Sequence, residues 1–173
     1  VRSRGLEGAP TPPPQIAYRL LFTPGLFSCV VAGEANSGYA VASYAVMRNA
    51  SGRAWHWPLS DGLGLPRHLF CPIVMPGTVR GQLRADIAEE TGLGRVDVIA
   101  VGSHDTASAV AAVPAKADER PVAFITSGTW ALLGVELVAP ALTLEARRAQ
   151  LPTEGGIGAG SYTHLTQLTK KTG

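Results

Sequence analysis

The sequence predicts an α/β protein, because a strand, a helix and a hairpin follow one another in its second half. Residues 96–101 are mostly β-branched or small, as in a buried strand. Residues 104–113 are rich in alanine and predict a helix that Pro114 ends. Residues 122–125 and 132–137 are strand-like and flank a Ser/Thr/Gly turn, which predicts a hairpin.

The first part of the chain predicts shorter elements. Residues 1–15 contain four prolines and predict an extended, disordered lead-in. Residues 16–33 predict one or two short helices that are interrupted at Pro24 and end at Gly33. Residues 39–47 form a mixed apolar run, for which periodicity does not distinguish helix from strand.

Turn-forming residues separate the remaining elements. Residues 49–52 have the composition of a turn. Residues 82–91 carry apolar side chains at helical spacing, and Gly92 ends the predicted helix. A last helix is predicted over residues 143–150, with Thr143 as its candidate N-cap.

The composition excludes several classes of function. The chain has 173 residues, of which 46% are hydrophobic, so it is able to bury a core and is not a solvated disordered chain. Its 15 Lys and Arg against 13 Asp and Glu give a net charge of +2, which provides no basis for nucleic acid or a membrane surface as the main partner. Its most apolar stretch is too short to span a bilayer, and the N-terminal residues lack a secretory signal pattern.

The two cysteines indicate a reducing compartment. Cys29 and Cys71 are too few for a disulfide framework, and neither has the spacing of a zinc site. We expect two buried free thiols, although a single bridge between them is also compatible with the sequence. We therefore expect a cytoplasmic protein without a metal-ligating cluster.

The first candidate site is the segment Gly-Ser-His-Asp-Thr at residues 102–106. Asp105 follows a predicted strand and opens a predicted helix, where open α/β sheets bind ligands. A carboxylate there is able to take a proton from a substrate hydroxyl, as the phosphorylation of an alcohol requires of a base. The alternative is structural: aspartate is a common N-cap, and His104 then contacts only the backbone.

The second candidate site is the segment Ile-Thr-Ser-Gly-Thr-Trp at residues 125–130. Its hydroxyls, glycine and backbone amides are suited to holding phosphate oxygens. No lysine accompanies them, so the segment is not a P-loop, and an ordinary turn is the alternative.

Two further segments favour structural interpretations. Residues 154–160 are rich in glycine, but their spacing does not fit a dinucleotide-binding fingerprint, so they predict a flexible loop. Trp55, His56 and Trp57 are compatible with a sugar-stacking platform, but a small apolar cluster is the favoured interpretation.

Two of these motifs together resemble the FGGY carbohydrate kinase family. The most specific are SHDTASAV at residues 103–110 and SGTWALLGVE at residues 127–136, and the resemblance extends from residue 16 to residue 158. Ala32-Gly33-Glu34 is similar to a Thr-Gly-Glu-like turn of the family. The histidine before Asp105 and the threonine after it resemble members that act on L-rhamnulose more than those that act on glycerol, xylulose or gluconate.

The resemblance implies an incomplete actin-like, ribonuclease-H-like fold. Residues 16–102 correspond to the end of the first kinase lobe, and residues 103–160 correspond to the beginning of the second, nucleotide-binding lobe. Residues 161–173 do not resemble the family. Their first residues are similar to translated sequencing-adapter read-through, so we interpret them as an unrelated tail without functional information.

The resemblance also implies the chemistry. The family transfers the γ-phosphoryl group of ATP, with Mg²⁺, to a sugar hydroxyl, here the 1-hydroxyl of L-rhamnulose in rhamnose catabolism. Asp105 matches the catalytic base, and His104 and Thr106 match neighbours that bind the sugar. Gly128 and Thr129 match the ATP-binding turn. The implied partners are therefore a small sugar and ATP.

Departures from the family pattern limit these expectations. The family's phosphate-binding hairpin and its aspartate have no counterpart here, Thr153 stands in place of an asparagine, and Gly25 stands in place of an aspartate. We therefore expect these 173 residues alone to be inactive. Two alternatives remain: an FGGY kinase acting on a different ketose or polyol, and a non-catalytic α/β binding module in which Asp105 is only a cap.

Overall fold

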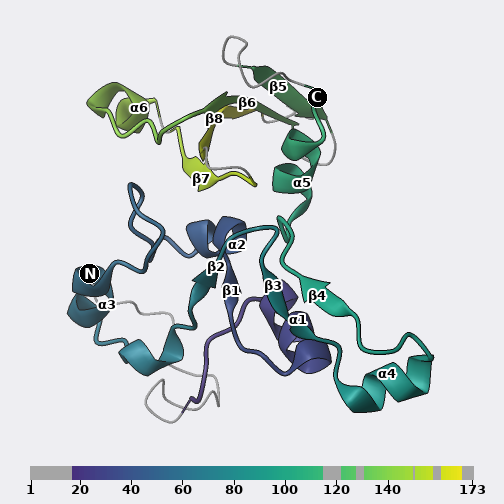
Figure 1. The fold of residues 1–173 in the computed structure, drawn as a ribbon. Helices are drawn as coiled ribbons and strands as arrows, with labels where there is room; N and C mark the ends of the chain where they lie inside the picture. The colour runs from purple at the N-terminus through teal and green to yellow at the C-terminus, as the bar shows by residue number, and fades with distance from the viewer. Residues whose placement is uncertain (1–16, 115–121, 128–130, 150, 158–160, 169–173) are drawn as a thin grey trace, which may run out of the picture.

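The computed structural model describes residues 17–114, 122–127, 131–149, 151–157 and 161–168. Its elements form two groups, which Figure 1 draws one above the other. Residues 17–101 form the lower group, and the described residues between 105 and 168 form the upper group around a four-stranded sheet. A turn at residues 102–104 joins the two groups.

Helix α1 (Thr23–Ala32) begins near a proline and ends at a glycine. Pro24 lies in the first turn, where its missing N–H leaves no helical hydrogen bond unmade. Gly33 takes the left-handed conformation, with φ of 81°, and its N–H donates to the carbonyl of Cys29. The predicted stop at Gly33 is confirmed. The predicted interruption at Pro24 is wrong, because a proline in the first turn starts a helix.

Short helices and two two-stranded sheets make up the rest of the lower group. In chain order they are β1 (Ser37–Gly38), α2 (Tyr39–Tyr44), α3 (Trp57–Gly62), η1 (Arg67–Leu69), β2 (Ile73–Val74), β3 (Val79–Gln82), α4 (Ala85–Thr91) and β4 (Asp97–Ile99). Strands β1 and β2 pair in parallel, and β3 and β4 pair antiparallel. The undecided run at 39–47 therefore contains a helix. The helix predicted over 82–91 begins later, because Gln82 belongs to β3.

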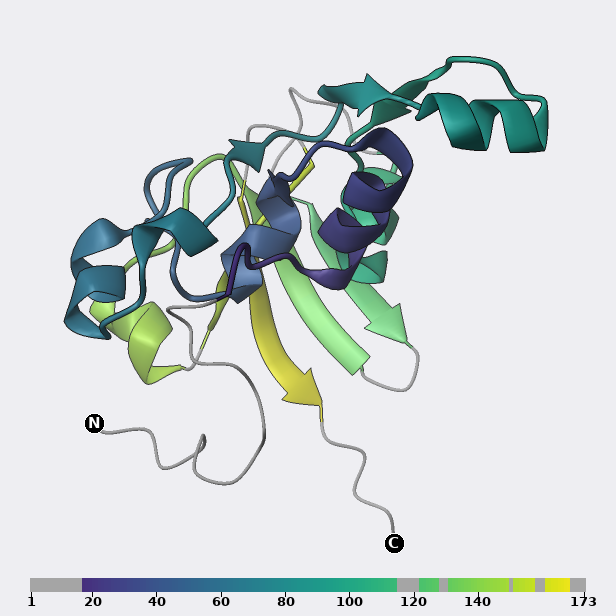
Figure 2. The same ribbon diagram turned by 90° about the horizontal axis from the view of Figure 1, so that it is seen from below.

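Helix α4 and the ends of β3 and β4 next to it project from the rest of the molecule as an arm (Figures 1 and 2), while β3 also packs on α1. Val96, Ile99 and Val101 are 46%, 45% and 62% exposed. The prediction of a buried strand over 96–101 is therefore wrong. Among the described strands β4 pairs only with β3, and a sheet of two strands is too narrow to bury it.

The upper group is built on an antiparallel sheet with the strand order β5-β6-β8-β7. Its elements are α5 (Asp105–Ala111), β5 (Ala123–Ser127), β6 (Ala131–Leu137), α6 (Leu144–Arg148), β7 (Thr153–Gly155) and β8 (Ser161–Leu168). Strands β5 and β6 pair from Ala123↔Val135 to Ser127↔Ala131, which confirms the predicted hairpin. Thr143 caps α6, since its Oγ1 accepts a hydrogen bond of 3.1 Å from the N–H of Ala146.

Strand β8 lies within the segment that the sequence assigns to an unrelated tail. Its backbone pairs with β6 on one side and with β7 on the other. A ladder of backbone hydrogen bonds depends little on side-chain identity, so a strand forms here without apolar alternation in the sequence. The origin of the tail stays a prediction. The lead-in at residues 1–15 and residues 169–173 lie outside the described residues.

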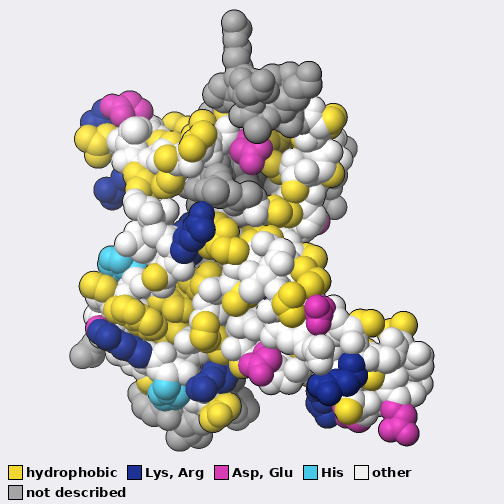
Figure 3. All heavy atoms as spheres, in the orientation of Figure 1, with side chains coloured by type: hydrophobic (Ala, Val, Ile, Leu, Met, Phe, Trp, Pro, Cys, Tyr) yellow, Lys and Arg dark blue, Asp and Glu magenta, His cyan; other side chains and the backbone are white. Residues whose placement is uncertain are grey.

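The buried core joins the two groups. Ala40 of α2 clusters with Ala107 and Val110 of α5 and with Phe124 of β5, and Ile157 packs against them. The core is small, and hydrophobic side chains remain on the surface of the lower group (Figure 3).

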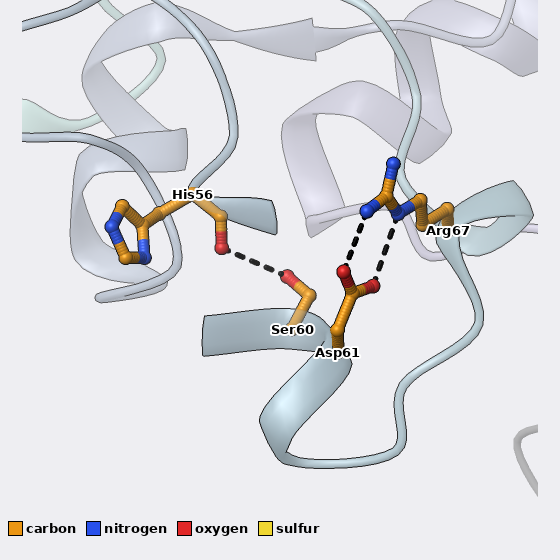
Figure 4. A network of polar contacts seen from close by, with 4 residues as sticks. All are labelled: His56, Ser60, Asp61 and Arg67. Carbon is orange, nitrogen blue, oxygen red and sulfur yellow. Dashed lines mark hydrogen bonds and ion pairs between the residues drawn. The ribbon is translucent and has the colours of Figure 1, made fainter. Parts of the chain in front are cut away.

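A satellite cluster surrounds α3. The ring of Phe70 lies 5.1 Å from that of Trp55 and 5.9 Å from that of Trp57, which supports the apolar-cluster interpretation of this segment. Arg67 donates to both carboxylate oxygens of Asp61, at 3.0 and 2.5 Å (Figure 4). In the same view the hydroxyl of Ser60 donates to the carbonyl of His56. These contacts indicate a packing role for Trp55 and Trp57.

Candidate functional site

Asp105 stands in the first turn of α5, at the junction of the two groups. The chain enters this helix through Ser103, whose φ of 65° turns the backbone sharply. His104 is the N-cap: its Nδ1 accepts a hydrogen bond of 3.2 Å from the N–H of Ala107. The interpretation of Asp105 as the cap is therefore wrong, because the imidazole of its neighbour makes the capping bond.

The carboxylate of Asp105 is exposed, and Thr106 orients it. Asp105 Oδ1 accepts hydrogen bonds of 2.6 Å from the N–H of Thr106 and 3.3 Å from its Oγ1. The three sugar-site residues predicted from the sequence thus lie together, with His104 fixing the helix start and Thr106 fixing the carboxylate. This geometry leaves a carboxylate facing solvent, where a hydroxyl is able to approach it.

Tyr44 of α2 lies beside this turn. Its ring centroid is 4.9 Å from that of His104, and the two planes meet edge to face at 83°. Burial raises the pKa of Tyr44, and the charge of Glu154, a hydrogen bond to Glu154 and the charge of Asp105 raise it further. Tyr44, His104, Asp105 and Glu154 therefore form one cluster drawn from α2, α5 and β7.

Strand β7 is fastened to α2 by close contacts. The N–H of Gly155 donates to Ser43 Oγ at 3.1 Å. A β-carbon added at Gly155 would lie 2.5 Å from Cε1 of Tyr39, so only glycine permits this approach. Glu154 is only 8% exposed. The prediction of a flexible loop is wrong for residues 154–156, which are buried against α2.

Two buried arginines brace α2 and β1 from the side of the lower group. The guanidinium of Arg48 lies 4.6 Å from the centroid of the Tyr39 ring and donates to its hydroxyl at 3.2 Å. Arg80 donates to the side chain of Asn36, and burial lowers the pKa of Arg80. These contacts hold α2 in place, and with it Tyr44.

The predicted ATP-binding residues Gly128 and Thr129 lie outside the described residues. Strands β5 and β6, which precede and follow them in the sequence, pair with each other. A pocket of about 270 Å³ lies beside α5. The lining residues are Ala107, Val110, Ala111, Val113, Glu136, Gly156 and Ile157.

The described residues do not fit a magnesium site built by the protein alone. No three His, Cys, Asp or Glu side chains come together in this part of the chain. Kinases commonly hold Mg²⁺ through substrate phosphates and one or two carboxylates, which does not require such a group.

The cysteines lie apart from this cluster. Cys71 is buried and Cys29 partly buried, and both are free, which confirms the expectation of free thiols. None of the helices in the described ranges has the length and apolar character needed to cross a membrane.

Sequence reasoning missed Tyr44 and Glu154. Tyr44 lies in an apolar run without a recognisable motif, and Glu154 opens a glycine-rich segment interpreted as a loop. The similarity of residues 153–156 to the family's Asn-Glu-Gly-Gly segment was a signal at Glu154, whereas Tyr44 acquires its place only from a contact between segments far apart in the chain.

Comparison with known proteins gives consistent relatives. The chain is 40% identical over 143 residues to a rhamnulokinase of Bacteroides thetaiotaomicron, a match that covers 83% of this chain and 29% of the relative. It is 35% identical over 140 residues to a rhamnulokinase of Enterococcus faecalis, with 81% and 28% covered. No family model matches the chain. The chain thus spans about three tenths of the length of the curated relatives it matches.

Solved structures show the same fold. A xylulose kinase from Brucella ovis matches with a TM-score of 0.69 at 20% identity, covering 85% of this chain and 30% of that one. A carbohydrate kinase from Novosphingobium aromaticivorans matches with a TM-score of 0.69 at 23% identity, covering 84% and 32%. The predicted fold class, part of an actin-like sugar kinase fold, is confirmed, as is the resemblance that carried it.

Proposed function

Since the chain is a relative of the rhamnulokinases, within the FGGY carbohydrate kinases, we propose that it carries the base of a sugar kinase. The reaction transfers the γ-phosphoryl group of ATP to the 1-hydroxyl of L-rhamnulose in rhamnose catabolism. One observation carries the proposal: the exposed carboxylate of Asp105 stands where the two groups of elements meet, oriented by Thr106.

Asp105 accepts the proton of the sugar hydroxyl as its oxygen attacks the γ-phosphorus of ATP. The new oxygen–phosphorus bond forms while the bond to the β-phosphate bridging oxygen breaks, and ADP leaves with the electron pair. His104 and Thr106 bind the sugar and hold its hydroxyl near the carboxylate. Gly128 and Thr129 contact the phosphates of ATP. Mg²⁺ accompanies the nucleotide and neutralises charge on its phosphates.

The division of the chain into parts of two lobes belongs to the same proposal. Residues 16–102 form the end of the first lobe and residues 103–160 the beginning of the second, and the contact of α2 with β7 and α5 supports this division. Catalysis by positioning requires the complete constellation of groups, so these 173 residues alone have little or no activity. The protein acts in the cytoplasm.

A hybrid enzyme tests the proposed reaction. Residues 16–158 replace the matching stretch of the Bacteroides thetaiotaomicron relative, and ADP release is measured with ATP and a panel of sugars. L-Rhamnulose is expected to be the best substrate, ahead of L-fructose, D-xylulose and glycerol. A preference for another ketose or a polyol would refute the assignment of the sugar, and a folded hybrid inactive with every sugar would refute the kinase assignment. The unmodified chain, assayed in parallel, is expected to release no ADP.

A further inference from the structure

The ring of Tyr44 is more exposed than two other aromatic rings of the lower group. Tyr44 is 49% exposed, whereas Tyr39 on the same helix is 5% exposed and Trp55 is 7% exposed. The rings of Tyr44 and His104 meet edge to face, with their centroids 4.9 Å apart. A half-exposed aromatic ring therefore remains at the turn that carries Asp105.

The phenol of Tyr44 is held in place from the other side. Glu154, which is 8% exposed, lies on β7, and β7 is hydrogen-bonded to Ser43, the residue before Tyr44. Glu154 is fixed in turn, because the next residue, Gly155, donates to Ser43 Oγ and packs on the ring of Tyr39. The ring thus has a fixed orientation without being covered.

Such a ring suits a polyhydroxylated ligand. Binding sites combine aromatic surface with a few fixed polar groups, and an aromatic ring with a polar tip presents an apolar face beside a hydrogen-bonding group. A ketose carries both C–H surface and hydroxyls. His104 directly precedes Asp105, and its ring lies 4.9 Å from that of Tyr44, so a sugar bound at His104 and Asp105 lies beside the Tyr44 ring.

We infer that Tyr44 is a sugar-contacting residue, an aromatic wall of the ketose site at Asp105 that Glu154 holds in position. This inference rests on the proposed function and extends it, since it assigns a binding role to α2 of the lower group. The ring packs against the carbon chain of the sugar, while His104 and Asp105 contact its hydroxyls.

Nuclear magnetic resonance of the 173-residue chain tests the inference, because it detects weak binding. The chain carries ¹³C-labelled tyrosine and histidine and is titrated with L-rhamnulose. The Tyr44 signals, assigned from Tyr44→Phe, are expected to shift with the same saturation curve as those of His104. The signals of Tyr39, a buried ring on the same helix, serve as the internal control and are expected to stay in place.

Two variants distinguish the contribution of the aromatic ring from that of the hydroxyl of Tyr44. Tyr44→Ala is expected to weaken L-rhamnulose binding about tenfold, because the aromatic surface is lost. Tyr44→Phe keeps the ring and is expected to weaken binding by about threefold or less. Unchanged signals from Tyr39 show that α2 remains folded in each variant, and if Tyr44→Ala unfolds, the shifts of the Tyr44 signals in the parent chain decide.

The outcomes distinguish this inference from the proposed function. If His104 shifts saturably while Tyr44 does not, or if Tyr44→Ala binds as the parent does, the inference is overturned and the sugar site stands. If neither His104 nor Tyr44 responds to any ketose, the proposed sugar site and the inference both fail.

Discussion

Helices α4 and α5 share a local design and differ in their surroundings. Each has seven residues and an aspartate in its first turn, Asp86 in α4 and Asp105 in α5. In the arm, both carboxylate oxygens of Asp86 accept hydrogen bonds from Arg84, at 3.1 and 2.6 Å. At the junction, Asp105 accepts hydrogen bonds from Thr106 and lies near the phenol of Tyr44.

The two helices also differ in what they bury. Helix α4 buries Ala88 in an arm with an exposed strand, whereas α5 buries Ala107 and Val110 in the core that joins the two groups. Two short helices that both carry an aspartate in the first turn therefore have different roles. An arginine satisfies the carboxylate in the arm, and the junction presents its carboxylate beside side chains from other segments. The side chains that other segments place beside Asp105, more than its local sequence, make it a candidate base.

The largest effect on stability is expected at the junction, from Gly155→Ala. The new β-carbon would lie 2.5 Å from Tyr39 and would force β7 away from α2. We expect the free energy of unfolding, measured with urea, to fall by about 1–3 kcal/mol. Gly62→Ala is the matched control, because a β-carbon at Gly62 meets no atom within 4 Å. Equal losses in the two variants would contradict a tight junction.

Alkaline pH is expected to weaken the junction. The pKa of Tyr44 is raised in the folded protein, mainly by burial and by Glu154, whereas an unperturbed tyrosine ionises near pH 10. The contribution of Tyr44 to the free energy of unfolding is fully present below about pH 10. It is lost as the pH rises further, because the tyrosine of the unfolded chain loses its proton at a lower pH than that of the folded chain. Urea unfolding at several alkaline pH values should show this decline, and Tyr44→Phe and Glu154→Gln should both reduce it. A decline of the same size in Tyr44→Phe would exclude Tyr44 as its source.

Thiol reactivity is expected to distinguish two sites within the lower group, which holds both cysteines. Cys71 is 1% exposed, and burial raises its pKa, whereas Cys29 is partly exposed. A colorimetric disulfide reagent should modify Cys29 at least about tenfold faster than Cys71. Cys71 should stay protected in Gly155→Ala, because that strain falls on α2 and β7. Rapid modification of Cys71 in the parent chain would contradict its burial.

The smallest effect is expected in the arm, from Asp86→Asn. The pair of Asp86 with Arg84 is solvent-exposed, and exposed pairs contribute little to stability because water screens them. The urea midpoint of Asp86→Asn should match that of the parent within error. A clear loss of stability would show that the arm depends on this pair.

Local chemistry made much of the fold predictable. The helix stops at Gly33 and Gly92 and the cap at Thr143 depend on neighbouring backbone atoms, and the sequence predicted all three. The exposure of β4 and the pairing of β7 with β8 depend on which segments meet across the chain. Periodicity carries no information about such encounters, so these features were missed or predicted wrongly.

In the candidate site too, the residues that are neighbours in sequence were predicted, and those brought in by long-range contacts were not. His104, Asp105 and Thr106 are consecutive, so a motif was able to indicate them. Tyr44 and Glu154 join the site through contacts between α2 and β7; Tyr44 stands in no motif, and Glu154 stands in a segment similar to the family's Asn-Glu-Gly-Gly, to which no role was assigned. The capping role of His104 was also missed, because an aspartate beside a helix start is the more common cap.

Replacing Asp105 and Asp86 in the hybrid kinase tests the central claim most directly. Both changes remove one exposed carboxylate from the first turn of a seven-residue helix. With ATP and L-rhamnulose, we predict that Asp105→Asn lowers turnover by about 10²–10⁴-fold at an unchanged urea midpoint, while Asp86→Asn keeps parental turnover. Parental turnover in a folded Asp105→Asn hybrid would contradict the assignment of Asp105 as the base.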